Sequence, residues 1–197
     1  MKQIYYCRHG ECELNLQKVF AGRSDSPLTE LGRQQAVLAG QDIIAKGIKI
    51  DRIVSSSLWR AYETAVILAR EIGYLEQDII TSDLLIERNF GMLEGTPRTE
   101  FFDAHSYQDI DLAPRAETIE ELHQRASDAL AFVETFPEEN VLVVSHSAFY
   151  RAFRRAVKHD PFSHEYTSPF MTIKNGKVYD LGEVTKETVQ DLIQISE

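Results

Sequence analysis

The chain has 197 residues, of which 43% are hydrophobic, and it carries a formal net charge of −10. This length predicts a single domain over residues 1–197, which would bury about 70% of the surface that its unfolded chain exposes. The acidic balance argues against a general binder of nucleic acids or anionic membranes, so an anionic ligand would need a local basic cluster.

The sequence carries no clear membrane, disulfide or metal signal. No apolar run approaches the roughly 20 residues of a membrane span, and no signal segment follows Met1. Cys7 and Cys12 are the only cysteines, and we expect free thiols rather than a disulfide. Without further ligands nearby, their spacing is a poor metal signature. These features predict a cytoplasmic protein with no metal and no membrane partner.

The first predicted strand covers residues 4–7 and runs directly into Arg8, His9 and Gly10. Ligands bind at the carboxyl ends of strands in open α/β sheets, and a glycine lets the backbone approach a ligand closely. A chance Arg-His pair in a surface turn would look the same in this segment alone. The interpretation therefore depends on whether later segments supply partners for the same site.

Strands and helices alternate along the rest of the chain. Further strands are predicted at residues 51–54, 79–81 and 141–144, and helices at residues 29–46, 58–72, 117–136 and 149–157. Residues 87–115 are expected to be irregular. Residues 171–179 predict a hairpin with Asn175-Gly176 at its turn, and residues 186–195 predict a weaker helix. The alternation predicts a three-layer α/β/α sandwich with a mainly parallel central sheet and the hairpin strands at one edge.

Polar side chains of complementary types stand at the ends of several predicted strands. These are Arg8 and His9 after the first strand, residues 55–60 after the second, Glu87 after an apolar stretch, and His146 after residues 141–144. Guanidinium groups match phosphate oxygens bidentately, so arginines and histidines converging on one pocket favour a phosphoryl ligand. A neutral imidazole inside such a cage is also a competent nucleophile toward phosphorus.

Four blocks of this sequence resemble the histidine phosphatase superfamily, which includes the cofactor-dependent phosphoglycerate mutases. The blocks are residues 8–11 with Asn15, Gly22-Arg23 and residues 28–32; residues 55–65; Glu87 with residues 90–91 and 94–95; and residues 144–147. Each block is weak alone, but their order and spacing cover roughly residues 4–157. The resemblance implies the phosphoglycerate mutase-like fold.

The resemblance also implies roles for individual residues. His9 would be phosphorylated, and Arg8, Arg60 and His146 would hold the phosphoryl oxygens. Asn15 and the backbone near Gly22 would add donors. Glu87 would protonate the leaving oxygen and then activate water, with Glu94 as a nearby rival for this role. No metal or cofactor is implied, because the arginines supply the positive charge.

Two positions near the implied site depart from the mutase pattern. Ser147 stands where the family usually has glycine, so it is a bulkier candidate for contact with the substrate. Ala148 stands where the mutases have asparagine. Arg98, in contrast, falls where the mutases keep a lysine, which makes it a candidate for binding the substrate.

The segment that covers the site in mutases is shortened here to about residues 101–114. It leaves only Arg115 in place of an adjacent arginine pair. The segment carries Asp103, Asp109 and Asp111, which we expect to repel a trianionic phosphoglycerate. These departures favour hydrolysis over a mutase reaction.

We expect a phosphatase that acts on small phosphomonoesters, with phosphorylated small molecules and phosphate as its ligands and no nucleic-acid partner. A cofactor-dependent phosphoglycerate mutase is the second interpretation. A non-catalytic phospholigand-binding module is the third, although pure binding needs neither the nucleophile His9 nor the acid Glu87. The remaining histidines lack a partner pattern, and we expect them to be structural or exposed: His105, His123, His159 and His164.

Overall fold

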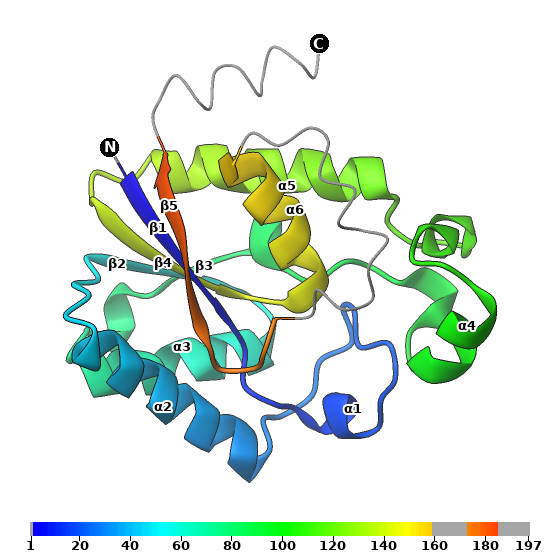
Figure 1. Cartoon of the computed structure of the whole chain (residues 1–197), viewed down its shortest axis with the longest axis horizontal. Helices are drawn as coiled ribbons and strands as arrows, with labels where there is room; N and C mark the ends of the chain where they lie inside the picture. The colour runs from blue at the N-terminus through cyan, green and yellow to red at the C-terminus, as the bar shows by residue number, and fades with distance from the viewer. Residues whose placement is uncertain (1, 159–172, 185–197) are drawn as a thin grey trace.

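A five-stranded sheet lies at the centre of the computed structural model, which describes residues 2–158 and 173–184 (Figure 1). The strands are β1 (Lys2–Arg8), β2 (Arg52–Ser56), β3 (Ile80–Ser82), β4 (Asn140–Ser145) and β5 (Val178–Val184). They are arranged in the order β3-β2-β4-β1-β5. All neighbours are parallel except β1 and β5, so the predicted mainly parallel sheet with an antiparallel edge is confirmed.

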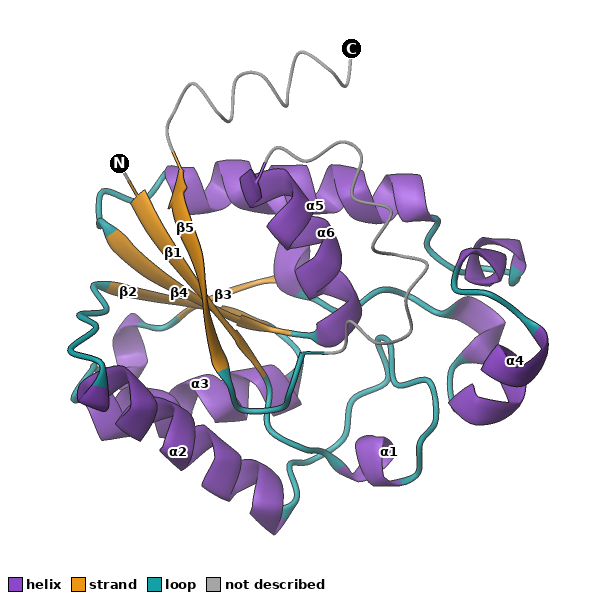
Figure 2. Cartoon of the chain, in the orientation of Figure 1, coloured by secondary structure: helices purple, strands orange, loops and turns teal. Residues whose placement is uncertain are grey.

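Helices cover both faces of this sheet, as Figure 2 shows, with α2 and α3 on one side and α5 and α6 on the other. The helices are α1 (Glu13–Leu16), α2 (Glu30–Ala45), α3 (Trp59–Ile72), α4 (Arg98–Ala104), α5 (Ile119–Glu134) and α6 (Ser147–Lys158). The three-layer α/β/α architecture expected from the sequence is therefore confirmed. Within the described ranges, no helix combines the length and the apolar character needed to cross a membrane.

The central strand β4 shows how the two layers are held to the sheet. Successive side chains of a strand point to opposite faces. Val141 and Val143 accordingly pack with α5 and α6, whereas Leu142 and Val144 pack with α2 and α3. All four side chains are fully buried, and each such burial stabilises the fold by about 1.5–3 kcal/mol. The unbroken apolar run of β4 therefore reflects a strand that is covered on both faces.

Local signals set the ends of the long helices. The Thr29 hydroxyl accepts a hydrogen bond from Gly32 N at 3.0 Å and caps the start of α2. Thr118 and Glu121 form a capping box at the start of α5. Helix α3 ends at Gly73, whose φ of 71° is left-handed and favours glycine.

The register of the sheet brings the ends of three strands together. Arg8 at the end of β1 is paired with Ser145 of β4, and Ser55 of β2 is paired with Val144 of β4. Because these strands are parallel, the residues that follow them emerge at the same edge of the sheet. His9, His146 and the start of α3 are thereby brought to one place.

Three expectations about local structure need correction or lie outside the described ranges. Only the second strand of the predicted hairpin is present in residues 173–184, and it pairs with β1 rather than with the residues before it. The short helices α1 and α4 were not predicted, because so few residues cannot display a helical repeat. The helix predicted at residues 186–195 lies outside the described residues.

Candidate active site

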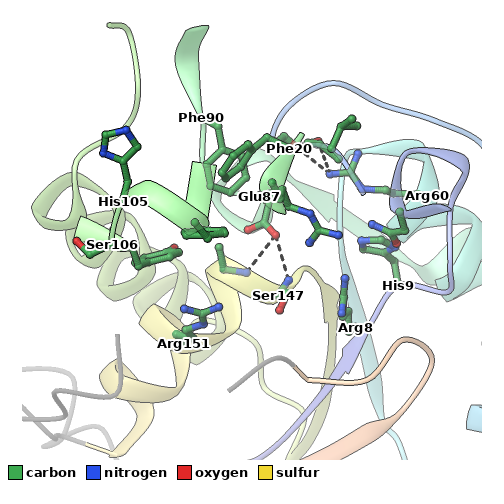
Figure 3. Close-up of a pocket in the computed structure, with 18 residues that line it drawn as sticks. Arg8, His9, Phe20, Arg60, Glu87, Phe90, His105, Ser106, Ser147 and Arg151 are labelled. Atoms are coloured by element: carbon green, nitrogen blue, oxygen red, sulfur yellow. Dashed lines mark hydrogen bonds between the residues drawn. The ribbon is translucent and has the colours of Figure 1, made fainter. Parts of the chain in front are cut away.

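A cavity of about 200 Å³ opens at the carboxyl edge of the sheet (Figure 3). All of the predicted site residues except His146 line it: Arg8, His9, Asn15, Gly22, Arg60, Glu87, Arg98 and Ser147. They come from segments far apart in the chain. The convergence that the interpretation of the sequence required is therefore present.

His9 directly follows β1 and is only 3% exposed. Its Nδ1 lies 2.7 Å from the carbonyl oxygen of Gly10. A carbonyl oxygen only accepts hydrogen bonds, so Nδ1 carries the ring proton and Nε2 keeps its lone pair. Burial, followed by the charges of Arg60 and Arg8, holds the pKa of His9 well below the ordinary 6.5. The imidazole is therefore neutral near pH 7, with an unprotonated Nε2.

The backbone around His9 is tightly enclosed. Gly10 N donates to the Thr64 hydroxyl at 3.0 Å, which ties the residue to α3. A Cβ at Gly10 would lie 2.2 Å from the carbonyl oxygen of Gly32, so only glycine fits beside the first turn of α2. The glycine after His9 is thus required by a close backbone approach within the protein.

Arg60 is almost completely buried at the start of α3, with 1% of its surface exposed. Its Nη1 donates to Ser24 O at 2.9 Å and to Asp25 Oδ1 at 3.2 Å. Its Nη2 donates to Ala21 O at 3.2 Å and to Gly22 O at 2.7 Å. The guanidinium group therefore orders the loop that contains Gly22 while it brings a positive charge to His9.

Arg8 supplies a second, partly buried guanidinium group. Its Nη1 donates to Ile173 O at 2.7 Å, and its buried Nε has no hydrogen-bond partner in the described part of the chain. Burial lowers the pKa of Arg8, while the Glu87 carboxylate acts in the opposite direction. Because a guanidinium group stays charged at neutral pH, Arg8 can donate to an anion in the cavity.

His146 is fully buried and does not line the cavity. Its ring centroid lies 5.1 Å from that of His9, and its Nε2 lies 2.8 Å from the Ser56 hydroxyl. Its buried Nδ1 has no partner among the residues described. Burial, then Arg60 and His9, hold the pKa of His146 well below the ordinary 6.5. His146 is thus a neutral ring that packs behind His9.

The Glu87 carboxylate caps the N-terminus of α6. Its Oε2 accepts hydrogen bonds from Ser147 N and Ala148 N, both at 3.1 Å, and its Oε1 accepts from Phe149 N and Arg88 N, both at 2.9 Å. A negative charge is favourable at a helix N-terminus. These four bonds fix the carboxyl group in the cavity wall. Figure 3 draws the two from Ser147 N and Ala148 N as dashed lines at Glu87.

Glu94, the rival for the acid role, has a different environment. Its carboxylate accepts from Arg23 N and Ser24 N, both at 2.8 Å, and does not line the cavity. Glu94 therefore orders the loop beside Gly22. At Gly22 itself a Cβ would lie 2.7 Å from Arg88 O, which explains why glycine stands there.

The remaining candidates also have defined contacts. Asn15 Oδ1 accepts from Asn175 Nδ2 at 3.3 Å, so Asn15 faces the turn before β5. The Ser147 hydroxyl is buried without a partner in the described ranges, and its backbone N–H is engaged by Glu87. Arg98 begins α4, and burial lowers its pKa.

The expected repulsion by acidic residues over the site is not found. Asp103, Asp109 and Asp111 do not line the cavity. Asp111 pairs with the buried Arg88, and Asp109 accepts from Ser106 N at 2.6 Å. Asp109 and Asp111 are therefore engaged within the protein, and none of the three stands in the cavity wall, where the argument against a phosphoglycerate ligand needs them.

Two of the histidines expected to be structural or exposed lie in the described ranges. His105 is exposed, as expected, and it also lines the cavity. His123 contacts Arg155 on α6. His159 and His164 lie outside the described residues.

Several cavity residues were not predicted from the sequence. Arg151 lies four residues after Ser147 on α6, and this spacing, which puts both on one face of the helix, could have revealed it. The aromatic residues have no comparable signal because they come from segments without a periodic pattern: Phe20, Phe90, Phe102 and Tyr107. Asn175, whose side chain donates to His9 O at 2.8 Å, was read only as part of a turn.

The mainly parallel sheet covered by helices defines an α/β protein. The neutral histidine and the guanidinium groups lie together at the carboxyl edge of this sheet, and such an arrangement suits an anion. Residues 4–184 match the family model of the histidine phosphatase superfamily (branch 1). The chain belongs to this superfamily, which confirms the resemblance seen in the sequence. No group of three or more His, Cys, Asp or Glu side chains that could hold a metal ion occurs in the described residues.

Relatives in this superfamily include phosphatases and mutases. The chain is 38% identical over 149 residues to the uncharacterized phosphatase PhoE of Bacillus subtilis, covering 75% of this chain and 73% of the relative. It is 33% identical over 150 residues to a 2,3-bisphosphoglycerate-dependent phosphoglycerate mutase of Parvibaculum lavamentivorans, covering 71% of each. Among solved structures, the mycobacterial glucosyl-3-phosphoglycerate phosphatase Rv2419c with VO3 matches with a TM-score of 0.76, 26% identity and coverage of 90% and 91%.

Proposed function

We propose that this protein is a phosphatase that hydrolyses small phosphomonoesters through a phosphohistidine at His9. The observation that carries the proposal is the contact of His9 Nδ1 with Gly10 O at 2.7 Å, which leaves the Nε2 lone pair free in a buried ring. Arg8 and Arg60 stand beside this nucleophile. The relatedness to PhoE and to a phosphatase captured with VO3 supports the same chemistry.

In the first step, Nε2 of His9 attacks phosphorus, and the bond from phosphorus to the ester oxygen breaks. The electron pair of that bond leaves with the oxygen, which takes a proton from the carboxyl group of Glu87. The products are a free alcohol and phosphohistidine. Arg8 and Arg60 stabilise the charge on the transferring phosphoryl oxygens, which is the main catalytic requirement of phosphoryl transfer. His146, which lies outside the cavity and packs against His9, supports the ring from behind.

In the second step, water attacks phosphorus, and the carboxylate of Glu87 takes the proton that the water loses. The bond between phosphorus and Nε2 breaks, and its electron pair returns to the imidazole. The Nδ1 proton stays on the ring throughout, hydrogen-bonded to Gly10 O. The sum of both steps is a phosphomonoester plus water giving an alcohol plus phosphate, with the enzyme regenerated.

The proposal includes no metal or cofactor, because guanidinium groups supply the positive charge. Asn15, Gly22, Arg98 and Ser147 bind or shape the substrate in this scheme. A phosphoglycerate mutase is the second candidate, favoured by the relatedness to mutases and by the cationic residue Arg98 in the cavity. We prefer hydrolysis over the mutase reaction because of the residues that follow His146. The mutases have a glycine and then an asparagine after this histidine, and Ala148 stands at the position of that asparagine.

Rapid chemical quenching with a phosphate-labelled substrate tests this proposal. An acid-labile, base-stable adduct should form in the wild-type protein and be absent in His9→Ala. Labelling that persists in His9→Ala would contradict the assignment of the nucleophile. Following 3-phosphoglycerate with and without a bisphosphoglycerate primer separates the two candidates, because isomerisation faster than phosphate release would identify a mutase.

A further inference from the structure

The chain that bears Glu87 has no regular structure of its own. Strand β3 ends at Ser82, one turn of 3-10 helix follows at Asp83–Leu85, and residues 87–89 belong to neither a helix nor a strand. Glu87 is nevertheless buried, and its carboxyl group faces Ser147 at the start of α6 in Figure 3. Because a buried backbone needs hydrogen-bond partners, contacts from other segments must hold this stretch in place.

Arg125 of α5 binds carbonyl groups of this stretch. Its Nη1 donates to Leu84 O at 2.9 Å and to Ile86 O at 2.7 Å. Its Nη2 reaches Glu87 O at the longer distance of 3.4 Å. The guanidinium group is planar and rigid, so its donors hold these acceptors in one arrangement, and only 13% of the side chain is exposed. Arg125 therefore fixes the chain that leads into Glu87.

Glu117, just before α5, holds Arg125 in turn. Arg125 Nε donates to Glu117 Oε1 at 2.7 Å, and Arg125 Nη2 donates to Glu117 Oε2 at 2.8 Å. A bidentate pair of this kind fixes the orientation of both side chains. Glu117 Oε2 also accepts from Asn89 N at 3.1 Å, and Glu117 N donates to Asn89 O at 2.9 Å. The clamp (Arg125 and Glu117) thus holds the chain on both sides of Glu87.

Arg125 also contacts the helix that receives the Glu87 carboxylate. The centre of its guanidinium group lies 4.9 Å from the ring centroid of Phe149 on α6. Phe149 N donates to Glu87 Oε1 at 2.9 Å. Arg125 therefore touches both the backbone that bears Glu87 and a residue that binds its carboxylate. Neither Arg125 nor Glu117 lines the cavity.

The location of the Glu87 carboxyl group matters for the reaction proposed above. In that scheme His9 follows β1 and Arg60 lies on α3, whereas Glu87 belongs to neither element. A proton donor must lie within hydrogen-bond reach of the leaving oxygen, and a misplacement of about 1 Å costs about 100-fold in rate. The rate therefore depends on contacts that hold the Glu87 chain in place.

We propose that Arg125, held by Glu117, is a positioning residue that places the Glu87 carboxyl group in the cavity wall. Its effect on the rate rests on the proposed function, because that scheme gives Glu87 the acid role. The alternative is an ion pair that only stabilises the fold, and this alternative predicts no dependence of the effect on the leaving group.

The variant Arg125→Lys tests the proposal while it keeps a positive charge beside Glu117. An ammonium group has no planar fork, so it cannot bind the carboxylate and the carbonyl groups of Leu84 and Ile86 together. We expect kcat to fall about tenfold for alkyl phosphates, whose poor leaving group needs the proton. For activated aryl phosphates, kcat should fall less than about twofold.

Arg52→Lys is the matched control. Arg52 pairs with Glu138 and donates to Asp78 O at 3.3 Å. Its guanidinium centre lies 5.7 Å from the ring centroid of Phe136. These are the same kinds of contact that Arg125 makes, but Arg52 begins β2, at the end of the sheet away from the cavity. The control should change neither kcat nor the ratio between the two substrate types.

A second variant covers the case in which Arg125→Lys does not fold. Arg125→Met combined with Glu117→Gln removes both charges of the clamp, so no single charge is left buried. It should show the same dependence on the leaving group. Equal losses on both substrate types, with unchanged amide exchange at the start of α6, would overturn the proposal.

A double-mutant cycle assigns the effect to Glu87. Glu87→Gln already lacks the acid, so adding Arg125→Lys to it should slow alkyl phosphates less than about twofold further. Two independent effects would multiply instead. A further loss of about tenfold would show that Arg125 acts by another route, and it would refute the proposal.

Amide hydrogen exchange follows the carboxylate without turnover. Ala148 N and Phe149 N are bonded to Glu87 at 3.1 Å and 2.9 Å. In Arg125→Lys their exchange should be about tenfold faster relative to the amides of β4, and in Arg52→Lys it should be unchanged. Unchanged exchange in folded Arg125→Lys would contradict the positioning role. Faster exchange with equal kcat losses on both substrate types would uphold that role and refute only the acid role of Glu87 in the proposed function.

Discussion

The side-chain amide of Asn175 donates a hydrogen bond to the backbone carbonyl of His9 at 2.8 Å, across 166 positions of the chain. The next residue, Gly176, donates its N–H to Arg8 O at 3.0 Å. The turn before the antiparallel edge strand β5 therefore holds the end of β1, which His9 directly follows. Asn175 is a positioning residue, because it acts on the backbone of His9 and not on the substrate.

Replacing Asn175 with alanine should impair turnover more than binding. The His9 carbonyl loses its partner, so the ring is less well oriented, and we expect kcat to fall about tenfold with a smaller change in KM. Asn140→Ala is the matched control, because Asn140 Nδ2 makes a similar bond to Asp51 at 2.7 Å near the opposite end of the sheet. Both variants should lose about 1 kcal/mol of unfolding free energy. An equal loss of kcat in both would show that Asn175 has only a structural role.

The neutral, buried histidines predict that the protein loses stability in mild acid. The pKa values of His9 and His146 are both lowered well below 6.5 by burial and by Arg60. Below about pH 6.5 the unfolded chain binds protons at these residues while the folded protein does not, so stability falls as the pH falls. Each histidine should contribute about 1.4 kcal/mol per pH unit in that window.

Denaturant unfolding at a series of pH values measures this effect. The slope of unfolding free energy against pH should become shallower in His146→Gln, because one of the two groups no longer titrates. His123 is a further contributor that is only partly buried, since burial and Arg155 lower its pKa to about 4. An unchanged slope in His146→Gln would contradict the neutral state of this ring in the folded protein.

Substitution of Glu87 should distinguish proton donation from binding. In Glu87→Gln, alkyl phosphates with poor leaving groups should slow by at least about 100-fold, whereas activated aryl phosphates should slow much less, because they need little protonation. The amide nitrogen would also face N–H donors of α6, so the variant should lose about 1–3 kcal/mol of unfolding free energy. Glu94→Gln is the control, and it should show no such dependence on the leaving group. Equal losses on both substrate types would assign Glu87 to binding or folding.

The reaction should be independent of metal ions and sensitive to phosphate analogues. Arg8 and Arg60 supply positive charge at His9, so activity should survive dialysis against a chelator. Vanadate or phosphate should inhibit competitively by occupying the same cage. Inactivation by the chelator, with recovery on adding Mg²⁺, would refute this mechanism.

Much of the fold and of the candidate site could be predicted from local sequence. The apolar run of β4 reflects burial on both faces, and Gly73 ends α3 through its own backbone preference. Arg8 and His9 stand directly after a strand, as His146 does, and parallel strands bring such residues to one edge of the sheet whatever the loops do. These features depend on neighbours in the chain or on a simple rule of topology, so the sequence alone was sufficient for them.

Other features depend on contacts between distant segments, and only the tertiary structure decided them. The turn at Asn175 precedes β5, which pairs with β1, and no local pattern shows that pairing. Asp111 forms an ion pair with Arg88 and does not line the cavity. Arg151 stacks on Tyr107 and lines the cavity. The sequence determined which chemical groups this protein has and where each strand ends. Which charges are paired and which remain for a ligand is decided by side chains far apart in the chain, and no local pattern encodes that pairing.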